Sequence, residues 1–383
     1  MKELLFIGMY PNNVNKYCNV FFQNLIFAIA DSGVSCTVVS PVPITRYRRR
    51  TKTIPKETVH YTPKGTAVKV YYPRYCSASS KQILFFNTEH ISEFLFEQSA
   101  MSVVKKLPTK FDAVYGHFFL YGGLTAIKAG KYLNIPSFLA YGECDFESQV
   151  RRTYGFPKPK QLAGLKGIVS VSTKNTNELI SLGIVKDVPI ITAPNATDLE
   201  LFTKLDKTEC RNKLGMPLDK FIVGFVGGFI ERKGDKRLLA AANDIDEVYL
   251  AFAGRGAPPP SGDRVVFCKA LEHQDVSVFL NAIDVFCLPT LSEGSCNAVV
   301  EAMACGCPVI SSDLPFNDDV LTDENSIRID PNSVAEIKAA IETLKSNVDL
   351  REKLSAAALE TAKGFGIDRR AERILSFISQ FTD

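Results

Sequence analysis

The segment Leu288–Asp313 reads LPTLSEGSCNAVVEAMACGCPVISSD, and its pattern decides how the fold is interpreted. An apolar strand ends at Leu288, a loop rich in Ser and Gly follows, and a helix is predicted to begin near Asn297. A Gly-Cys-Pro sequence at 306–308 then ends the helix and leads into another apolar strand. Strand, loop, helix and strand in this order predict a βαβ unit within a parallel sheet.

The same alternation continues outward in both directions. Strands are predicted in the first half at 4–8, 36–40, 113–115, 137–140, 168–172 and 190–193, and in the second half at 221–226, 248–253, 265–268, 285–288 and 309–311. Amphipathic helical segments, such as 20–32 and 121–133, lie between them. Short buried strands joined by helices predict a parallel sheet covered on both faces.

A turn-rich sequence, PNATD at 194–198, interrupts this alternation where the composition also changes. We therefore predict an α/β chain of two doubly wound, Rossmann-like domains, 1–198 and 199–365. A last amphipathic helix, in 366–383, is expected to pack back toward the N-terminal domain. Ligands in such sheets bind beyond the carboxyl ends of the strands.

The loop after Leu288 and the helix that follows carry groups suited to a nucleotide. Backbone N–H groups at the helix start can hold an anionic oxygen, helped by the helix dipole; the residues concerned are Ser295, Cys296, Asn297 and Ala298. Glu293 lies in the loop and Glu301 on the helix. A carboxylate in the first turns of that helix can bind a ribose diol.

A second segment, FIVGFVGGFIERKGDKRLL at 221–239, supports the same chemistry. A strand leads to Gly227 and Gly228, and Arg232 and Lys233 follow before a helix. Glycines allow close approach of the backbone to a ligand, and a cation beyond them can neutralise a diphosphate. Alone, the pattern fits a solvated helix start better than a ligand site.

Together these residues resemble the retaining glycosyltransferases of family 4, which have the GT-B fold of two Rossmann-like domains facing across a cleft. The pair Glu293 and Glu301, followed by AMACGCPVI, matches the family's E-x7-E motif. The resemblance implies that Glu301 binds the ribose, that Glu293 lies near the donor sugar and that Lys233 contacts the diphosphate. Many relatives have Arg where this chain has Gly228, and Arg232 is a candidate substitute.

The first half supplies candidate groups for the sugar and the acceptor at predicted strand ends. His117 follows one strand, and Tyr141, Glu143 and Asp145 follow another. Many relatives carry a His near the reacting carbon where this chain has Tyr141, so that role is not transferred. Asn19 stands where many relatives have a Gly facing the phosphates. A buried core histidine remains an open interpretation of His117.

Composition excludes several other classes of protein. The 383 residues are 46% hydrophobic and 23% charged, as in an ordinary globular protein. The apolar runs are shorter than the roughly 18 residues that a membrane-spanning helix needs, and the N-terminus is predicted to be a strand rather than a signal peptide. Ten Cys without a CxxC pair favour reduced thiols, and hence a cytoplasmic protein, over a disulfide framework or a zinc site.

The net charge of +3 conceals an uneven distribution. Residues 1–200 contain 24 Lys and Arg against 14 Asp and Glu, whereas residues 201–383 contain 21 against 28. The most basic stretch is TRYRRRTK at 45–52, with Arg46, Arg48, Arg49, Arg50 and Lys52. Such a cluster can bind anionic lipid headgroups, which predicts a peripheral enzyme at the inner face of the membrane; a solvated loop remains the alternative.

The resemblance implies a retaining, hexosyl-type glycosyltransferase of cell-surface polysaccharide assembly. Its partners would be a nucleotide-sugar donor, with UDP expected first and GDP or ADP as alternatives, and a glycan acceptor, expected to be lipid-linked; no nucleic acid is expected. No cofactor or metal is expected, because the DxD sequence at 244–246 fits a surface turn. Two alternatives stay open: a catalytically impaired nucleotide-sugar-binding scaffold, and a GT-B sugar epimerase.

Overall fold

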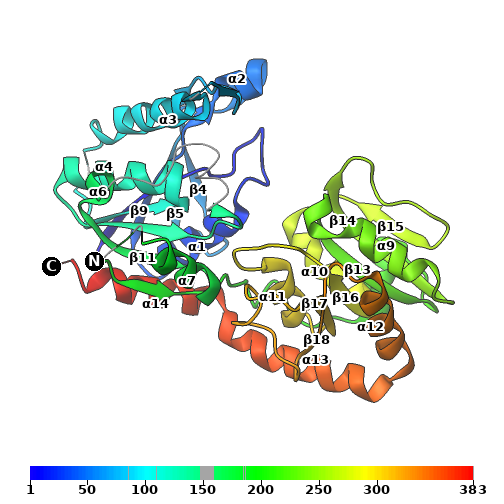
Figure 1. Cartoon of the computed structure of the whole chain (residues 1–383). Coiled ribbons are helices and arrows are strands. Elements are labelled where there is room, and N and C mark those ends of the chain that lie inside the picture. The colour runs from blue at the N-terminus through cyan, green and yellow to red at the C-terminus, as the bar shows by residue number, and fades with distance from the viewer. Residues whose placement is uncertain (85, 109, 147–158, 184, 186, 383) are drawn as a thin grey trace. The chain divides into compact units, whose positions relative to one another are not determined.

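The computed structural model describes residues 1–84, 86–108, 110–146, 159–183, 185 and 187–382 (Figure 1). The chain divides into two compact units. The first unit comprises Met1–Pro194 and Asp368–Asp383, and the second comprises Asn195–Ile367. Within the described ranges, no helix combines the length and the apolar character needed to cross a bilayer.

The first unit is built on an eight-stranded sheet with the order β12-β11-β10-β9-β1-β2-β5-β4. Its strands are β1 (Glu3–Ile7), β2 (Ser35–Val39), β4 (Glu57–Tyr61), β5 (Ala67–Tyr71), β9 (Ala113–His117), β10 (Ser137–Tyr141), β11 (Leu165–Ser170) and β12 (Ile190–Thr192). All neighbours are parallel except β4 and β5. Two short pairs accompany the sheet: β3 (Val42–Pro43) with β6 (Arg74–Tyr75), and β7 (Gln82–Ile83) with β8 (Phe86–Asn87).

Helices cover both faces of this sheet. They are α1 (Val20–Asp31), α2 (Ile44–Tyr47), the 3-10 turn η1 (Arg48–Thr53), α3 (Glu89–Val104), the π-helical turn η2 (Phe118–Leu124), α4 (Thr125–Leu133), α6 (Pro159–Leu162), α7 (Thr173–Ser181) and α14 (Ile367–Ser379). The helix predicted over 121–133 thus begins as a π-helical turn, where Gly122 passes so close to Gly116 of β9 that a side chain on either would clash.

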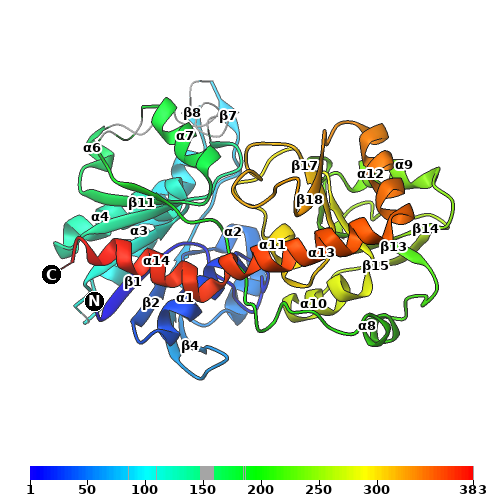
Figure 2. The same cartoon turned by 90° about the horizontal axis from the view of Figure 1, so that it is seen from below.

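Side-chain alternation assigns the residues of the strands to these two faces. Phe6 and Phe138 point to the face of α1 and α14, where they contact Phe22 and Phe377. Residues one step away, such as Leu5, Val114 and Leu139, join apolar clusters with α3 and α4. The last helix α14 lies beside α1 under the first unit, as Figure 2 shows.

One charged side chain is buried on the α14 face of this sheet. Arg370 is 5% exposed, and its Nε has no hydrogen-bond partner among the described residues. Burial lowers the pKa of Arg370, and the groups near it are Tyr115 and His117 of β9, whose polar atoms also lack partners within the described part of the chain. A buried charge without a counter-ion costs free energy of folding.

Arg370→Met should therefore raise the free energy of unfolding by about 1 kcal/mol or more, because Met fills similar space without a charge to desolvate. Urea denaturation at neutral pH measures the change. The exposed Arg369→Met is the matched control and should leave stability within about 0.5 kcal/mol. If Arg370→Met were less stable than the wild type while Arg369→Met was unchanged, Arg370 would not be an uncompensated charge.

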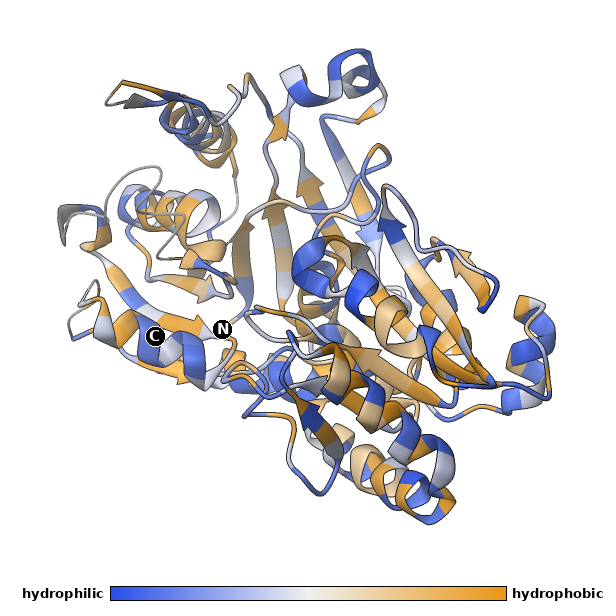
Figure 3. Ribbon diagram, turned by 45° about the vertical axis from the view of Figure 1, so that its right-hand side comes forward, coloured by the Kyte–Doolittle hydropathy of each residue, from blue (hydrophilic) through white to orange (hydrophobic). Residues whose placement is uncertain are grey.

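The second unit has a six-stranded parallel sheet with the order β15-β14-β13-β16-β17-β18. Its strands are β13 (Phe221–Phe229), β14 (Val248–Gly256), β15 (Val265–Lys269), β16 (Val285–Leu288), β17 (Val309–Ser312) and β18 (Ser326–Ile329). Its helices are α8 (Lys207–Leu214), η3 (Glu231–Lys233), α9 (Asp235–Asn243), α10 (His273–Ala282), α11 (Asn297–Ala304), α12 (Val334–Ser346), α13 (Val348–Ala362) and η4 (Lys363–Phe365). Figure 3 shows its strands as predominantly hydrophobic ribbons between more polar helices.

Two observations refine the predicted boundaries. Strand β13 continues through Gly227 and Gly228, which pair with Gly254 and Arg255 of β14. These glycines therefore belong to the strand and not to the loop that follows it. The link was predicted near Asp198, whereas the units divide after Pro194. Asn195 and the nearby Thr197 are hydrogen-bonded to Ser295 and Phe365, which holds the PNATD turn to the second unit.

Candidate functional site: a charged cluster at the start of α11

The loop between β16 and α11 places Glu293 among three hydrogen-bond donors. Its Oε1 lies 2.6 Å from Lys233 Nζ and 2.7 Å from Arg232 Nη1, and it accepts a hydrogen bond of 2.8 Å from Thr290 Oγ1. Glu293 is only 7% exposed. We call Arg232, Lys233 and Glu293 the charged cluster; it brings the two motifs of the sequence together.

Backbone contacts fix η3 against this loop. The N–H of Leu291 donates to the carbonyl of Arg232 at 2.8 Å, and the Arg232 guanidinium also donates to the Ser292 carbonyl. Gly234 follows with φ of 83°, and a Cβ there would lie 2.5 Å from the Pro289 carbonyl oxygen. Only glycine fits this position without a shift of the backbone, so Gly234 sets how closely the cations approach the loop.

The charged cluster carries more positive than negative charge. One carboxylate faces two cations, which leaves about one unit of positive charge in a half-buried position. Burial acts against the charge of Lys233, but the neighbouring Glu293 carboxylate raises the pKa of Lys233 above its ordinary value. The cluster therefore stays positive at neutral pH and can receive an anionic oxygen such as that of a phosphate.

The start of α11 offers further polar groups beside the charged cluster. No side chain caps the helix at Cys296, and Asn297 Oδ1 is buried without a partner in the described ranges. Ser295 is held by Asn195, which donates from its backbone N–H to Ser295 Oγ at 3.1 Å and from Nδ2 to the Ser295 carbonyl at 3.3 Å. Burial raises the pKa of the Cys296 thiol to about 12, so this thiol stays protonated. Ala298 is half-buried in the first turn.

Glu301 lies one turn further along α11 and is 8% exposed. Its Oε1 is 3.2 Å from Nε2 of His273, the first residue of α10. No motif in the sequence pointed to His273. Thr290 and Asn195 likewise hold predicted site residues without having been named as site residues themselves.

The glycines of β13 border the same region. A Cβ on Gly227 would lie 3.7 Å from Lys233 Cδ, and one on Gly228 would make only ordinary contacts, at 3.8 Å from the Arg255 carbonyl oxygen and 4.0 Å from Ile230 Cγ1. A side chain at Gly228 would therefore meet no severe clash at its Cβ. Arg232 occupies the charged cluster, on the side of η3.

The candidate residues of the first unit are more deeply buried than strand-end positions suggested. His117 is 5% exposed, its ring stacks on Phe22 at 4.2 Å between centroids, and neither ring nitrogen has a partner in the described chain. Burial, reinforced by the charge of Arg370, lowers the pKa of His117 to about 3. His117 is a neutral core residue in this structure, and the hydrogen bonds expected of a core histidine are missing.

Tyr141 and Glu143 differ from the expectation of open, ligand-facing groups. Tyr141 is fully buried in the apolar cluster with Phe119 and Phe146, and its hydroxyl donates to Glu178 Oε2 at 2.9 Å. Glu143 accepts hydrogen bonds from the N–H of Phe119 at 2.5 Å and of Gly142 at 3.0 Å. Burial raises the pKa of Glu143 to about 7 despite these bonds. Both residues thus support the turn at the end of β10.

Asp145 and Asn19 complete the predicted set. Asp145 is exposed beyond β10. Asn19 precedes α1 with φ of 49°, a left-handed conformation that Asn tolerates, and its Nδ2 donates to the Met9 carbonyl at 3.0 Å. This conformation explains why a Gly is acceptable at the equivalent position.

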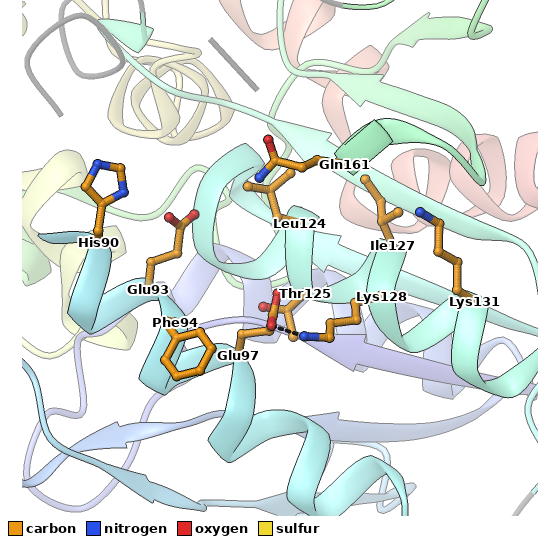
Figure 4. Close-up of a pocket in the computed structure, with 10 residues that line it drawn as sticks. All are labelled: His90, Glu93, Phe94, Glu97, Leu124, Thr125, Ile127, Lys128, Lys131 and Gln161. Carbon is orange, nitrogen blue, oxygen red and sulfur yellow. Dashed lines mark hydrogen bonds and ion pairs between the residues drawn. The ribbon is translucent and has the colours of Figure 1, made fainter. Parts of the chain in front are cut away.

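A cavity of about 380 Å³ lies elsewhere in the first unit, between α3 and α4 (Figure 4). It is lined by His90, Glu93, Phe94, Glu97, Leu124, Thr125, Ile127, Lys128, Lys131 and Gln161. Glu97 and Lys128 form an ion pair across it. None of the predicted site residues is among these lining residues, so the cavity is separate from the groups discussed above.

The predicted turn at 244–246 is confirmed. Asp244 follows the last residue of α9, and Asp246 is exposed and lies 3.6 Å from Arg264. Across the described residues, no group of three or more His, Cys, Asp or Glu is arranged to hold a metal ion.

Comparisons with known proteins agree with the geometry. Residues 206–361 match the family described as glycosyl transferases group 1. A Bacillus subtilis protein named for teichuronic acid biosynthesis, the glycosyltransferase TuaC, is 26% identical over 355 residues, which are 89% of this chain and 88% of that protein. A D-inositol 3-phosphate glycosyltransferase of Catenulispora acidiphila is 24% identical over 304 residues, 71% of this chain and 72% of that protein.

Solved structures show the same fold. Sucrose-phosphate synthase from Thermosynechococcus elongatus superposes with a TM-score of 0.75 at 18% identity, covering 99% of both chains. HepE of Anabaena, solved in complex with UDP, gives 0.71 at 15% identity, covering 99% of this chain and 100% of that one. The predicted resemblance and the predicted GT-B fold are both confirmed.

Proposed function

We propose that this chain, whose residues 206–361 match the group 1 glycosyltransferases, moves a hexose from a nucleotide-diphosphate sugar to a glycan hydroxyl, with retention at the anomeric carbon. The observation that carries the proposal is the charged cluster beside the uncapped start of α11, with Glu301 one turn away. A diphosphate needs an excess of positive charge, a sugar needs hydrogen-bonding groups, and a ribose needs a carboxylate. The second unit would be the donor domain, and the first the acceptor domain.

In this proposal Lys233 and Arg232 stabilise the charge that grows on the leaving diphosphate. Such preorganised donors act most strongly where negative charge develops in the transition state. Glu293 holds the two cations side by side, and on donor binding it would turn toward hydroxyls of the sugar while the phosphates take over the cations. Gly227 and Gly228 allow the phosphates to approach, and Ser295 to Ala298 supply backbone amides.

The first unit would contribute an uncharged imidazole and one carboxylate to sugar and acceptor binding. The pKa of His117 is lowered to about 3, so its imidazole is uncharged at any physiological pH. A neutral imidazole can exchange hydrogen bonds with a sugar hydroxyl, but it cannot stabilise a phosphate by charge. Asp145 is the exposed carboxylate of this set and is proposed to bind an acceptor hydroxyl. No residue is assigned as a covalent nucleophile, and no metal is required.

UDP is the first nucleotide to test, because HepE, which shares the fold, is solved with UDP. The acceptor is proposed to be a lipid-linked glycan of surface-polysaccharide assembly, in line with the name of the Bacillus subtilis relative. We place the enzyme in the cytoplasm, at the inner face of the membrane.

A two-step experiment tests this function. Thermal shifts with UDP, GDP, ADP and their sugars identify the donor, because a bound ligand stabilises the folded state in proportion to its occupancy. Transfer of labelled sugar to a lipid-linked glycan extract is then followed by mass spectrometry, with NMR of the anomeric configuration. Transfer with retention supports the proposal. Nucleotide binding without turnover would favour the scaffold alternative, and conversion of the donor sugar without an acceptor would favour an epimerase.

The basic segment 44–53 is the proposed membrane contact. Arg46, Arg48, Arg49, Arg50 and Lys52 are exposed on α2 and η1. The segment is held from within by Arg74, which donates to the carbonyls of Thr51 and Ile54. An ordered display of five cations favours binding to anionic lipid headgroups.

Replacing Arg46, Arg49 and Arg50 together by Ala should abolish most binding to anionic vesicles. Each basic residue near such a surface contributes about 1 kcal/mol, so the loss is roughly a hundred-fold in partitioning at low salt. Arg48 is not substituted, because its φ of 48° is left-handed and a change of residue there would also alter the backbone strain. Sedimentation with phosphatidylglycerol vesicles measures the effect, and Ala at the exposed Lys105, Lys106 and Lys110 is the charge-matched control. Equal binding by both triple variants would refute the membrane contact.

A further inference from the structure

His273 and Glu301 form a side-chain pair that joins α10 to α11. The Nε2 to Oε1 distance is 3.2 Å, and the His273 and Glu301 side chains are 31% and 11% exposed. The ring of His273 meets the ring of Phe202 at 5.2 Å between centroids and an interplanar angle of 63°. Phe202 thus supports one side of the imidazole, and Nε2 of His273 faces the Glu301 carboxylate.

The pair has a defined electrostatic setting. Two carboxylates face His273: Glu301 from α11 and Asp198 from the turn before α8. Burial works against the charge of His273, but the hydrogen bond and charge of Glu301 and the charge of Asp198 outweigh it, so the pKa of His273 is raised. An ordinary histidine has a pKa of about 6.5, and the pKa of His273 lies above that value.

We propose that His273 is a positioning residue for the nucleotide, which it serves through Glu301, and that its proton is coupled to nucleotide binding. This inference rests on the proposed function, because it needs Glu301 to bind the ribose. A carboxylate only accepts hydrogen bonds, and it has two oxygens. His273 donates to Oε1 and so fixes the carboxyl plane, which leaves Oε2 to accept a ribose hydroxyl.

The charge of His273 adds a second effect. A nucleotide diphosphate brings several negative charges toward a region where Glu301 and Asp198 are also negative, whereas Glu293 is already paired with Arg232 and Lys233. A protonated His273 offsets the charge of Glu301 and Asp198, so the nucleotide binds the protonated form more tightly. Since coupling of two ligands is reciprocal, nucleotide binding also favours uptake of the proton. Affinity is therefore greatest below the pKa of His273 in the free protein and falls as the pH rises through it.

The test is a calorimetric titration of the full chain with UDP, GDP and ADP from pH 5.5 to 9 at constant ionic strength. For the nucleotide that binds, the wild-type affinity divided by that of His273→Gln should fall about five-fold across this range. Gln keeps an N–H donor but cannot be protonated, and the ratio cancels ionisation of the nucleotide's own phosphate. His60→Gln, a histidine change in the first unit, is the matched control and should follow the wild type.

A second measurement separates positioning from a merely structural role. His273→Leu should weaken nucleotide binding roughly ten-fold and should reduce the preference for the ribonucleotide over its 2′-deoxy and 3′-deoxy analogues. A flat wild-type to Gln ratio together with undiminished ribose preference in His273→Leu would overturn the inference while the proposed function stands. Failure of the wild type to bind any of the three nucleotides would overturn both.

Discussion

Replacing Lys233 by Ala is expected to lower the turnover number for sugar transfer by about 10²–10³-fold, the usual effect of removing a donor that stabilises developing charge. Lys233 is held 2.6 Å from Glu293, and its pKa is raised, so it is charged where the diphosphate is proposed to leave. Its loss reduces the charged cluster from an excess of one positive charge to neutrality. Initial rates at saturating donor measure the effect directly.

Lys236→Ala is the matched control for this variant. Lys236 lies three residues further along in α9 and is exposed, so its removal changes the net charge equally without touching the charged cluster. It should retain turnover within about two-fold, as expected of a surface substitution. If Lys233→Ala turned over at the rate of Lys236→Ala, the phosphate role would have to move to another cation, with Arg232 the next to examine.

The sequence predicts six of the eight strands of the first sheet and five of the six of the second, because these strands are short apolar runs between polar helical segments. It misses β18, and it misses β4 and β5, whose residues alternate between exposed and more buried positions. The prediction ends β13 too early, at residue 226, because Gly227 and Gly228 are interpreted as a segment after the strand that lets a ligand approach the backbone. In the structure their backbones pair with β14, and Gly254 approaches Gly227 so closely that no side chain fits between them. A glycine pair that marks a loop and one that marks close strand contact look alike in sequence.

The site was predictable as two separate motifs, but the way they join was not. Spacing places Glu293 in a loop and Lys233 after a strand, and only the tertiary structure shows that one carboxylate oxygen serves both Lys233 and Arg232. His273 belongs to neither motif, and only the structure shows its contact with Glu301. Nothing in its local sequence distinguishes it from other helix-start residues.

In the first unit, the strand-end rule gave the position of Tyr141 but not the direction of its side chain. Alternation along β10 turns Tyr141 to the face where Phe119 and Phe146 pack, so its ring joins the core. Glu143 lies near the predicted position, but its carboxylate accepts a hydrogen bond from the backbone N–H of Phe119. Strand periodicity can predict such facing only when the register and the neighbouring helices are known.

Glu301→Gln should weaken nucleotide binding by roughly ten-fold or more, because Gln replaces one acceptor oxygen of the carboxylate with a donor that cannot accept a ribose hydroxyl. Glu352→Gln, an exposed change on α13, is the control. Calorimetric titration with the donor nucleotide gives the affinity, and unchanged affinity would contradict the ribose assignment.

The kinetics of Glu301→Gln and Lys233→Ala should differ in kind. A ribose contact is made equally in the ground state and in the transition state, so its loss raises KM for the donor and leaves kcat near that of the wild type. A cation at the leaving diphosphate acts mainly in the transition state, so its loss lowers kcat. If both variants lowered kcat alone, Glu301 would belong with the charged cluster rather than with the ribose. A raised KM in Glu301→Gln together with a lowered kcat in Lys233→Ala would separate nucleotide recognition on α11 from charge stabilisation on η3.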